Sequence, residues 1–250
     1  MDAHRRLLRL QRHLLRTIRG LYVKDDWYAG LFGNVYQGAV KNVTVTGYVG
    51  GTGPVGGIVG YGNNASITGC TNAATVKGGS STVGSIAIQD SSTGEYGASY
   101  LGGIVGRTLM PMEPSYISNC YSVGSLTHRG SASAAIRGIA GDVTLYAITN
   151  CYWLEGAAES GVGGYPSEAS AAAKSKADFA NGTVLALLKG DRTDSPWADE
   201  CRYVAAAGMT LPVFKGQTGD DAHTALWPTA ASVSLLAAAA LLLGKKKHLN

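Results

Sequence analysis

Charged residues are scarce in this sequence and unevenly placed. Asp, Glu, Lys and Arg make up 15% of the 250 residues, and the formal net charge is +4. The basic residues gather at the two ends, with six arginines between Arg5 and Arg19 and three lysines at 245–247, so the middle of the chain is nearly neutral. A broad basic face is therefore excluded, and we expect no nucleic-acid partner.

Side-chain groupings typical of enzymes are also missing. The four cysteines form no C-x-x-C pair with histidines at matching spacing, which excludes the common metal sites. No histidine lies in a motif that would activate a cysteine nucleophile. Carboxylates such as Asp142, Glu155 and Glu159 are scattered, so glycosidase-like chemistry has no candidate pair. The sequence predicts no catalytic residue, no metal and no cofactor.

Glycine is abundant, and it marks a repeat. The chain contains 35 glycines, and 45% of its residues are hydrophobic, enough to bury a core. Four copies begin near residues 29, 56, 101 and 136. In three of them the closing glycine of a Gly-apolar-apolar-Gly segment stands nine residues before an Asn or Gly, as Gly33 stands before Asn42. In the third copy an insertion at 110–114 separates Gly106 from Asn119.

Each copy reads as two short strands joined by a turn. Apolar pairs such as Ile58 and Val59 are too short for a helix and are flanked by glycines. Segments such as 117–123 alternate apolar and polar residues and include β-branched side chains. One unit cannot bury its apolar side alone, so the copies are expected to stack. The sequence predicts a mainly β fold, a parallel β-helix or β-solenoid, with an antiparallel sandwich as the alternative.

Three cysteines, Cys70, Cys120 and Cys151, occupy the same place in three copies. Equivalent side chains of stacked strands lie about 4.8 Å apart, so these three would form an internal stack of small hydrophobic groups. A Cys120–Cys151 disulfide is the alternative. Tyrosines also recur along the repeats, and we expect them to pack between strands or, alternatively, to stack on sugars or a partner protein.

The insertion in the third copy is the candidate binding loop. The insertion distinguishes the third copy from the others, so a ligand that recognises a single copy is expected to bind at this insertion. Its residues are Thr108, Leu109, Met110, Pro111, Met112, Glu113 and Pro114.

The repeat strings resemble the GLUG repeat of bacterial cell-surface proteins. GGIVG at 56–60 and 102–106, and Asn-Cys-Tyr at 119–121 and 150–152, follow its order of GGLVG, a spacer and NCY-x-x-G-x-V. The resemblance covers about residues 17–216 and implies a right-handed β-helix-like stalk or adhesin segment of an exported protein. It also implies an Ala/Ser linker and a small closing module after the repeats.

The last residues predict a membrane anchor. Residues 225–244 carry no charge and are followed by the lysines at 245–247. About 20 apolar residues at about 1.5 Å each span a hydrocarbon core of about 30 Å. Lysines stay on the cytoplasmic side, so residues 1–224 are expected to be extracellular.

The segment before this span resembles the LPxTG-type sorting signal that a sortase cleaves in Gram-positive surface proteins. Thr218 and Gly219 match its last two positions, so the resemblance implies cleavage between them and linkage to peptidoglycan. Lys215 and Gly216 replace the leucine and proline of the motif. Anchoring by the apolar span alone is therefore the alternative.

The first 20 residues lack the apolar core of the export signal that this orientation requires, and instead read as a basic amphipathic helix or a degraded leader. The predicted organisation has seven segments. They are the leader at 1–20, a repeat solenoid at 21–156, an Ala/Ser/Gly linker at 157–175, a small α/β module at 176–216, a sorting-like linker at 217–224, a transmembrane helix at 225–244 and a basic cytoplasmic tail at 245–250.

These observations together predict a non-enzymatic bacterial cell-surface protein, an adhesin-like or spacer solenoid anchored by its C-terminus. Its expected partners are the membrane through 225–244, peptidoglycan through a sortase, and a host glycan or matrix protein. The alternatives are a polysaccharide-active β-helix enzyme such as a lyase, and a cytosolic tail-anchored protein.

Overall fold

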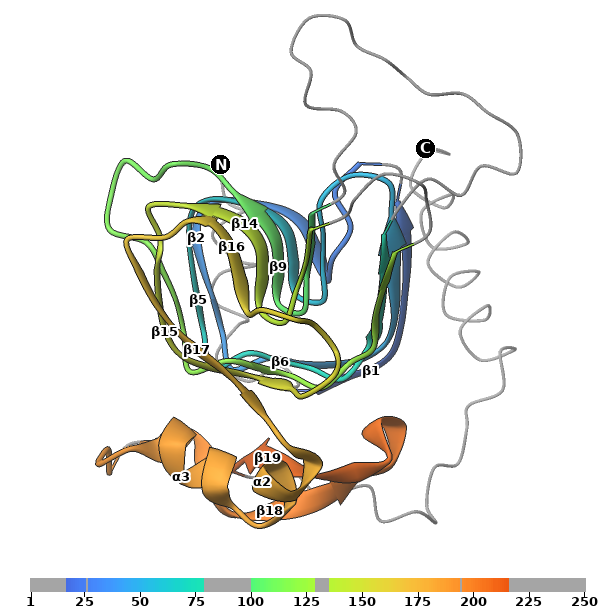
Figure 1. Cartoon of the computed structure of the whole chain (residues 1–250), viewed down its shortest axis with the longest axis vertical. Coiled ribbons are helices and arrows are strands. Elements are labelled where there is room, and N and C mark those ends of the chain that lie inside the picture. Colours follow the sequence, from blue (N-terminus) through green and yellow to red (C-terminus); the bar gives the residue numbers. More distant parts are fainter. Residues whose placement is uncertain (1–16, 26, 79–99, 129–134, 194, 216–250) are drawn as a thin grey trace, which may run out of the picture. The chain divides into compact units, whose positions relative to one another are not determined.

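The computed structural model describes residues 17–25, 27–78, 100–128, 135–193 and 195–215 (Figure 1). Within them the chain is mainly β, with a large parallel sheet and few helices, as predicted. The strands of the repeat region are β1 (Thr17–Asp25), β2 (Phe32–Lys41), β3 (Thr44–Gly51), β4 (Val55–Gly56), β5 (Val59–Thr68), β6 (Thr71–Asn72), β7 (Thr75–Gly78), β8 (Tyr100–Gly102), β9 (Val105–Thr108), β10 (Tyr116–Ser118), β11 (Tyr121–Ser122), β12 (Leu126–His128), β13 (Ala135–Arg137), β14 (Ala140–Thr144), β15 (Ala147–Leu154), β16 (Val162–Tyr165) and β17 (Glu168–Lys174).

Equivalent segments of the repeat pair in parallel. β2 pairs with β5, β5 with β9 and β10, and β10 with β15. In one row of the sheet Thr44, Thr71, Tyr121 and Tyr152 lie opposite one another. The copies found by sequence alignment are therefore neighbouring coils, which Figure 1 shows lying on one another. This pairing excludes the antiparallel sandwich.

The side chains inside the coils form the main core. It is built from residues at alternate positions of the strands, among them Val59, Val105, Ile117 and Ile148, all fully buried. Paired partners such as Ile117 and Ile148 come from successive coils. Each coil thus buries its apolar side only against the next, as the repeat pattern requires.

Two kinds of turn in the coils use a left-handed backbone. At the first, which we call the asparagine corner, the residues Asn42, Gly69, Asn119 and Asn150 have φ between 52° and 62°. Glycine and asparagine tolerate this conformation best, which explains why the repeat places them there. The second, the loop corner, comprises Gln37, Asn64 and Leu145, with φ between 50° and 57°, and the loop at 108–114 in the third coil.

In the second, third and fourth coils a glycine allows a side chain of the same coil to pack closely against it, as at Gly57, Gly103 and Gly138. A Cβ at Gly57 would lie 2.4 Å from Asn72 Cγ, and a Cβ at Gly103 would lie 2.3 Å from Ser122 Oγ. No larger residue fits without displacing its neighbour. The second glycine of the GGIVG string is therefore a packing requirement.

Most of the predicted linker at 157–175 is part of the sheet, as β16 (Val162–Tyr165) and β17 (Glu168–Lys174). β16 pairs with β14, and β17 pairs with β15, both in parallel. A ladder needs only backbone groups, so the small side chains of β17 (EASAAAK) join the sheet without the apolar alternation that identifies a strand in sequence. The coils therefore continue to Lys174.

The residues after β17 fold as two short helices and a β-hairpin. They are α2 (Lys176–Ala180), α3 (Thr183–Lys189), β18 (Trp197–Val204), the 3₁₀ helix η1 (Ala205–Ala207) and β19 (Met209–Phe214). Ser175 and Asp178 begin α2 with a reciprocal capping box. β18 and β19 pair antiparallel.

Within the described ranges, no helix is long and apolar enough to cross a membrane. The predicted span at 225–244 and the candidate cleavage residues Thr218 and Gly219 lie outside the described residues, as do residues 1–16 of the predicted leader. Residues 17–20, predicted as the end of that leader, belong instead to β1, which pairs with β3.

Candidate functional site

The three repeat cysteines point into the core beside the asparagine corner. All three are fully buried and free, so the alternative disulfide between Cys120 and Cys151 is not formed. Each thiol donates to the carbonyl two residues earlier: Cys70 to Thr68 at 3.5 Å, Cys120 to Ser118 at 3.2 Å and Cys151 to Thr149 at 3.3 Å. Burial raises the pKa of the Cys70 and Cys120 thiols, so they stay protonated at neutral pH.

The candidate binding loop is apolar and exposed. Thr108, which ends β9, is buried, but beyond it the side chains of Leu109, Met110 and Met112 are 43%, 60% and 90% exposed. Pro111 is half-buried, and Glu113 and Pro114 are exposed. An exposed apolar group of this kind is a common feature of interaction sites.

Hydrogen bonds hold this loop against the second coil. The backbone N–H of Leu109 donates to the Gly62 carbonyl at 3.0 Å, and that of Met112 donates to Asn64 Oδ1 at 2.7 Å. On the next coil, Leu145 at the loop corner is 50% exposed. The loop is thus fixed in place by its backbone while its apolar side chains face outward.

The tyrosines of the two Asn-Cys-Tyr strings serve packing. Tyr121 and Tyr152 point away from the coils and are 2% and 8% exposed, because the C-terminal helices and hairpin cover them. The Tyr121 ring lies 5.4 Å from Phe179 and 5.8 Å from Trp197, and its hydroxyl donates to the Pro212 carbonyl at 2.6 Å. These two rings are therefore not available to sugars.

A polar row that the sequence reading missed runs across the coils. Asn34, Tyr61, Arg107 and Asp142 pair in register on four neighbouring strands. Arg107 Nε donates to Asp142 Oδ2 at 3.0 Å, and the two side chains are 24% and 20% exposed. The alignment of the copies contains the signal, because each of these residues directly follows the closing glycine of its copy.

Two further tyrosines flank this row. The rings of Tyr28 and Tyr61 stack with centroids 4.8 Å apart, and the Arg107 guanidinium carbon lies 4.9 Å from the centroid of the Tyr100 ring. Aromatic rings, a cation and a carboxylate therefore lie together on successive coils, a combination able to bind a polar ligand.

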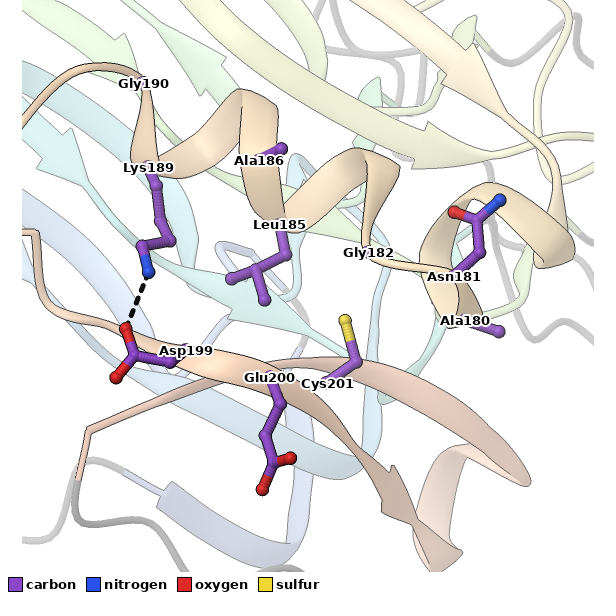
Figure 2. A pocket seen from close by; sticks show the side chains of 10 residues that line it. All are labelled: Ala180, Asn181, Gly182, Leu185, Ala186, Lys189, Gly190, Asp199, Glu200 and Cys201. Carbon is purple, nitrogen blue, oxygen red and sulfur yellow. Dashed lines mark hydrogen bonds and ion pairs between the residues drawn. The ribbon is translucent and has the colours of Figure 1, made fainter.

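A surface pocket of about 600 Å³ lies in the C-terminal helix and hairpin region. Figure 2 shows its lining, with Cys201 Sγ pointing toward the connection between α2 and α3. Lys189 Nζ donates to Asp199 Oδ1 at 2.8 Å, which lowers the pKa of Asp199, and burial raises the pKa of Cys201. The lining includes the carboxylates Asp199 and Glu200 but no histidine, the usual partner that activates a cysteine nucleophile.

Metal-binding chemistry has no candidate in the part of the chain that the structure describes. No group of three or more His, Cys, Asp or Glu residues there could hold a metal ion. The described surface offers two other groupings, the exposed apolar side chains of the loop at 108–114 and the polar row at Arg107 and Asp142.

Comparison with known proteins gives one distant structural likeness. No family model and no curated protein matches the chain. A crystal structure of a Bacteroides ovatus protein, provisionally identified as an immunoglobulin A1 protease, is similar with a TM-score of 0.37 and 17% sequence identity. The match covers 72% of this chain and 58% of that one, so this chain spans little more than half of its length.

Proposed function

We propose that this chain is a non-enzymatic, adhesin-like bacterial surface protein whose coils form a right-handed β-solenoid of GLUG-type repeats. In this proposal residues 225–244 anchor it, and the coils carry a binding surface outside the cell. The resemblance of the repeat strings supports the surface location. The parallel register of the coils supports the solenoid.

The observation that carries a binding role is the loop at 108–114. It exposes Leu109, Met110 and Met112 although its backbone is held to the second coil by two hydrogen bonds. A loop already ordered loses little conformational entropy on binding, and methionine adapts to an uneven partner surface. The predominance of exposed apolar side chains over the single charge at Glu113 favours a matrix protein over a glycan at this loop.

Surface location is tested by protease treatment of intact cells that express the full chain. Release of fragments from residues 21–216 is the expected result. Full protection of these residues, with cleavage only after lysis, would instead support the cytosolic tail-anchored alternative.

Binding through the loop is tested with a variant that changes Leu109, Met110 and Met112 to serine. Cells that display it should adhere at least about tenfold less to immobilised matrix proteins, since two or three buried apolar side chains each contribute about 1.5–3 kcal/mol. Tyr203→Ser is the matched control, because Tyr203 is 56% exposed on β18, away from the loop. Equal adhesion by the loop variant and the control would contradict binding through the loop and would support a spacer role for the coils.

A polysaccharide lyase is the second candidate function. The feature in its favour is the ion pair between Arg107 and Asp142 on successive coils. A lyase would release unsaturated sugars that absorb in the ultraviolet when the purified chain is incubated with a polyuronate. The non-enzymatic proposal expects no such product.

A further inference from the structure

The polar row and its flanking rings lie at one place in the fold. We define the tyrosine–arginine cluster as Tyr28, Tyr61, Tyr100, Arg107 and Asp142. Tyr61, Arg107 and Asp142 come from β5, β9 and β14, which pair in register. Tyr28 and Tyr100 approach them from the preceding sides of the coils, Tyr28 by ring stacking on Tyr61 and Tyr100 beneath the Arg107 guanidinium.

The cluster itself carries one positive and one negative charge, and together with a second arginine, Arg137, the described residues at this place carry one positive charge in excess. Its ion pair contributes one charge of each sign, and both side chains are mostly shielded from water, which strengthens their electrostatic interactions. Arg137 lies beside β16, the strand that pairs with β14, and its Nε is 3.2 Å from the position that a Cβ on Gly163 would occupy. That Nε is buried and has no hydrogen-bond partner among the described residues. Two guanidinium groups and one carboxylate favour an anionic ligand.

The spacing of the cluster suits a chain of sugars. Its members repeat along the coils at about 4.8 Å, the distance between paired strands, and an extended chain of pyranose rings advances by a similar distance per ring. Tyrosine rings stack on the apolar faces of sugars, and an arginine binds a carboxylate through two parallel N–H donors. We therefore propose that the tyrosine–arginine cluster binds an acidic polysaccharide, with a uronic-acid carboxylate at Arg107.

This inference deepens the proposed surface function and rests on it for access to extracellular polysaccharide. Its test uses the purified full chain, so it is independent of display and of the loop at 108–114. Isothermal titration with an oligogalacturonate hexasaccharide should show saturable binding that weakens with added salt. Maltohexaose tests for neutral sugar binding, and oligoglutamate tests for binding of any chain of carboxylates.

Charge variants separate a binding role from a structural one. Arg107→Gln should weaken oligogalacturonate binding at least about tenfold, because a hydrogen bond to a charged group contributes about 1.5–3 kcal/mol. Asp142→Asn should strengthen it severalfold, because the change removes a carboxylate that competes for Arg107 and repels the ligand. If the ion pair only stabilises the fold, both variants should bind oligogalacturonate more weakly than the unchanged protein. The double variant keeps hydrogen-bonding side chains at both positions and should bind as weakly as Arg107→Gln.

Ring variants test the stacking part of the site. Tyr61→Ala should weaken binding about twofold to tenfold. Tyr22→Ala is the matched control, since Tyr22 is also stacked on a neighbouring tyrosine, Tyr48, but lies outside the cluster. This variant should bind oligogalacturonate as the unchanged protein does. Absence of oligogalacturonate binding, equal binding of maltohexaose or oligoglutamate, or weakening by Asp142→Asn in a folded protein would overturn the proposal.

Discussion

The asparagine corner and the loop corner share a backbone conformation but differ in composition. Both place non-glycine residues at φ near 50–57°. At the asparagine corner the side chains bind one another: Asn150 Nδ2 donates to Asn119 Oδ1 at 2.6 Å and to the Leu187 carbonyl at 3.0 Å. At the loop corner Leu145 faces solvent. The left-handed backbone favours asparagine but does not require it, and the side-chain hydrogen bonds of Asn150 add to this preference at the asparagine corner.

This difference separates what the fold requires from what it leaves free. The asparagine corner keeps Asn or Gly in all four copies and Asn-Cys-Tyr in two of them. The loop corner holds Gln37, Asn64 and Leu145, and in the third coil it carries the loop at 108–114. Sequence variation between coils is therefore a guide to the binding surface.

The largest expected effect comes from removing the tyrosine beside the asparagine corner. Tyr121→Ala should lower the free energy of unfolding by about 3–5 kcal/mol, because a large buried ring is lost and the Pro212 carbonyl loses its donor. Urea unfolding followed by circular dichroism measures it. Tyr36→Ala beside the loop corner is the control, since Tyr36 is 64% exposed and its loss should change stability by less than about 0.5 kcal/mol.

The thiols inside the asparagine corner should make stability depend on alkaline pH. Burial raises the pKa of Cys70 and Cys120 in the folded state, so folding keeps them protonated while the unfolded chain ionises above about pH 8.5. Their contribution is complete below that pH and is lost as pH rises, by up to about 1.4 kcal/mol per pH unit for each thiol. The free energy of unfolding, measured in urea between pH 7 and 10, should fall less steeply with pH in the double variant Cys70→Ala/Cys120→Ala than in the unchanged protein. Equal slopes would contradict this account.

Asn150→Leu places the loop-corner residue at the asparagine corner. We expect the free energy of unfolding to fall by about 2–3 kcal/mol, from the cost of a left-handed leucine and from the lost side-chain hydrogen bonds. Asn150→Gly keeps the backbone conformation and loses only the hydrogen bonds, so it should be less destabilised. If the two variants unfold at the same urea concentration, the left-handed backbone contributes nothing.

The reciprocal change, Leu145→Asn, should have the smallest effect and the opposite sign. Asparagine tolerates φ of 57° better than leucine, and the half-exposed leucine loses little burial, so stability should rise by about 1 kcal/mol. Thermal unfolding measures the gain. A loss of stability would mean that Leu145 packs more strongly than its exposure indicates.

Much of the fold could be predicted because the residues that recur in the repeat, glycine and asparagine, have roles in the backbone conformation. Gly60 and Gly106, and likewise Asn119 and Asn150, stand at paired positions of neighbouring coils, so aligning the copies predicts their register. β16 and β17 were not predicted because the first (VGGY) is short and glycine-rich and the second (EASAAAK) is an Ala/Ser segment without apolar alternation.

The side-chain contacts were harder to foresee. The packing of Tyr121 under Trp197 joins residues of different segments, and no local pattern encodes it. Arg107 and Asp142 are 35 residues apart, and each alone looks like an ordinary surface charge. Only the aligned copies place them side by side.

The paired row of Thr44, Thr71, Tyr121 and Tyr152 has a consequence for how such a chain can change over generations. The intervals between these residues are 27, 50 and 31 residues, yet all four occupy equivalent positions in the ladder. A gene encoding this fold can therefore gain or lose codons between corners without shifting a single pairing partner. The same tolerance makes the loop at 108–114 a natural graft point for a foreign epitope.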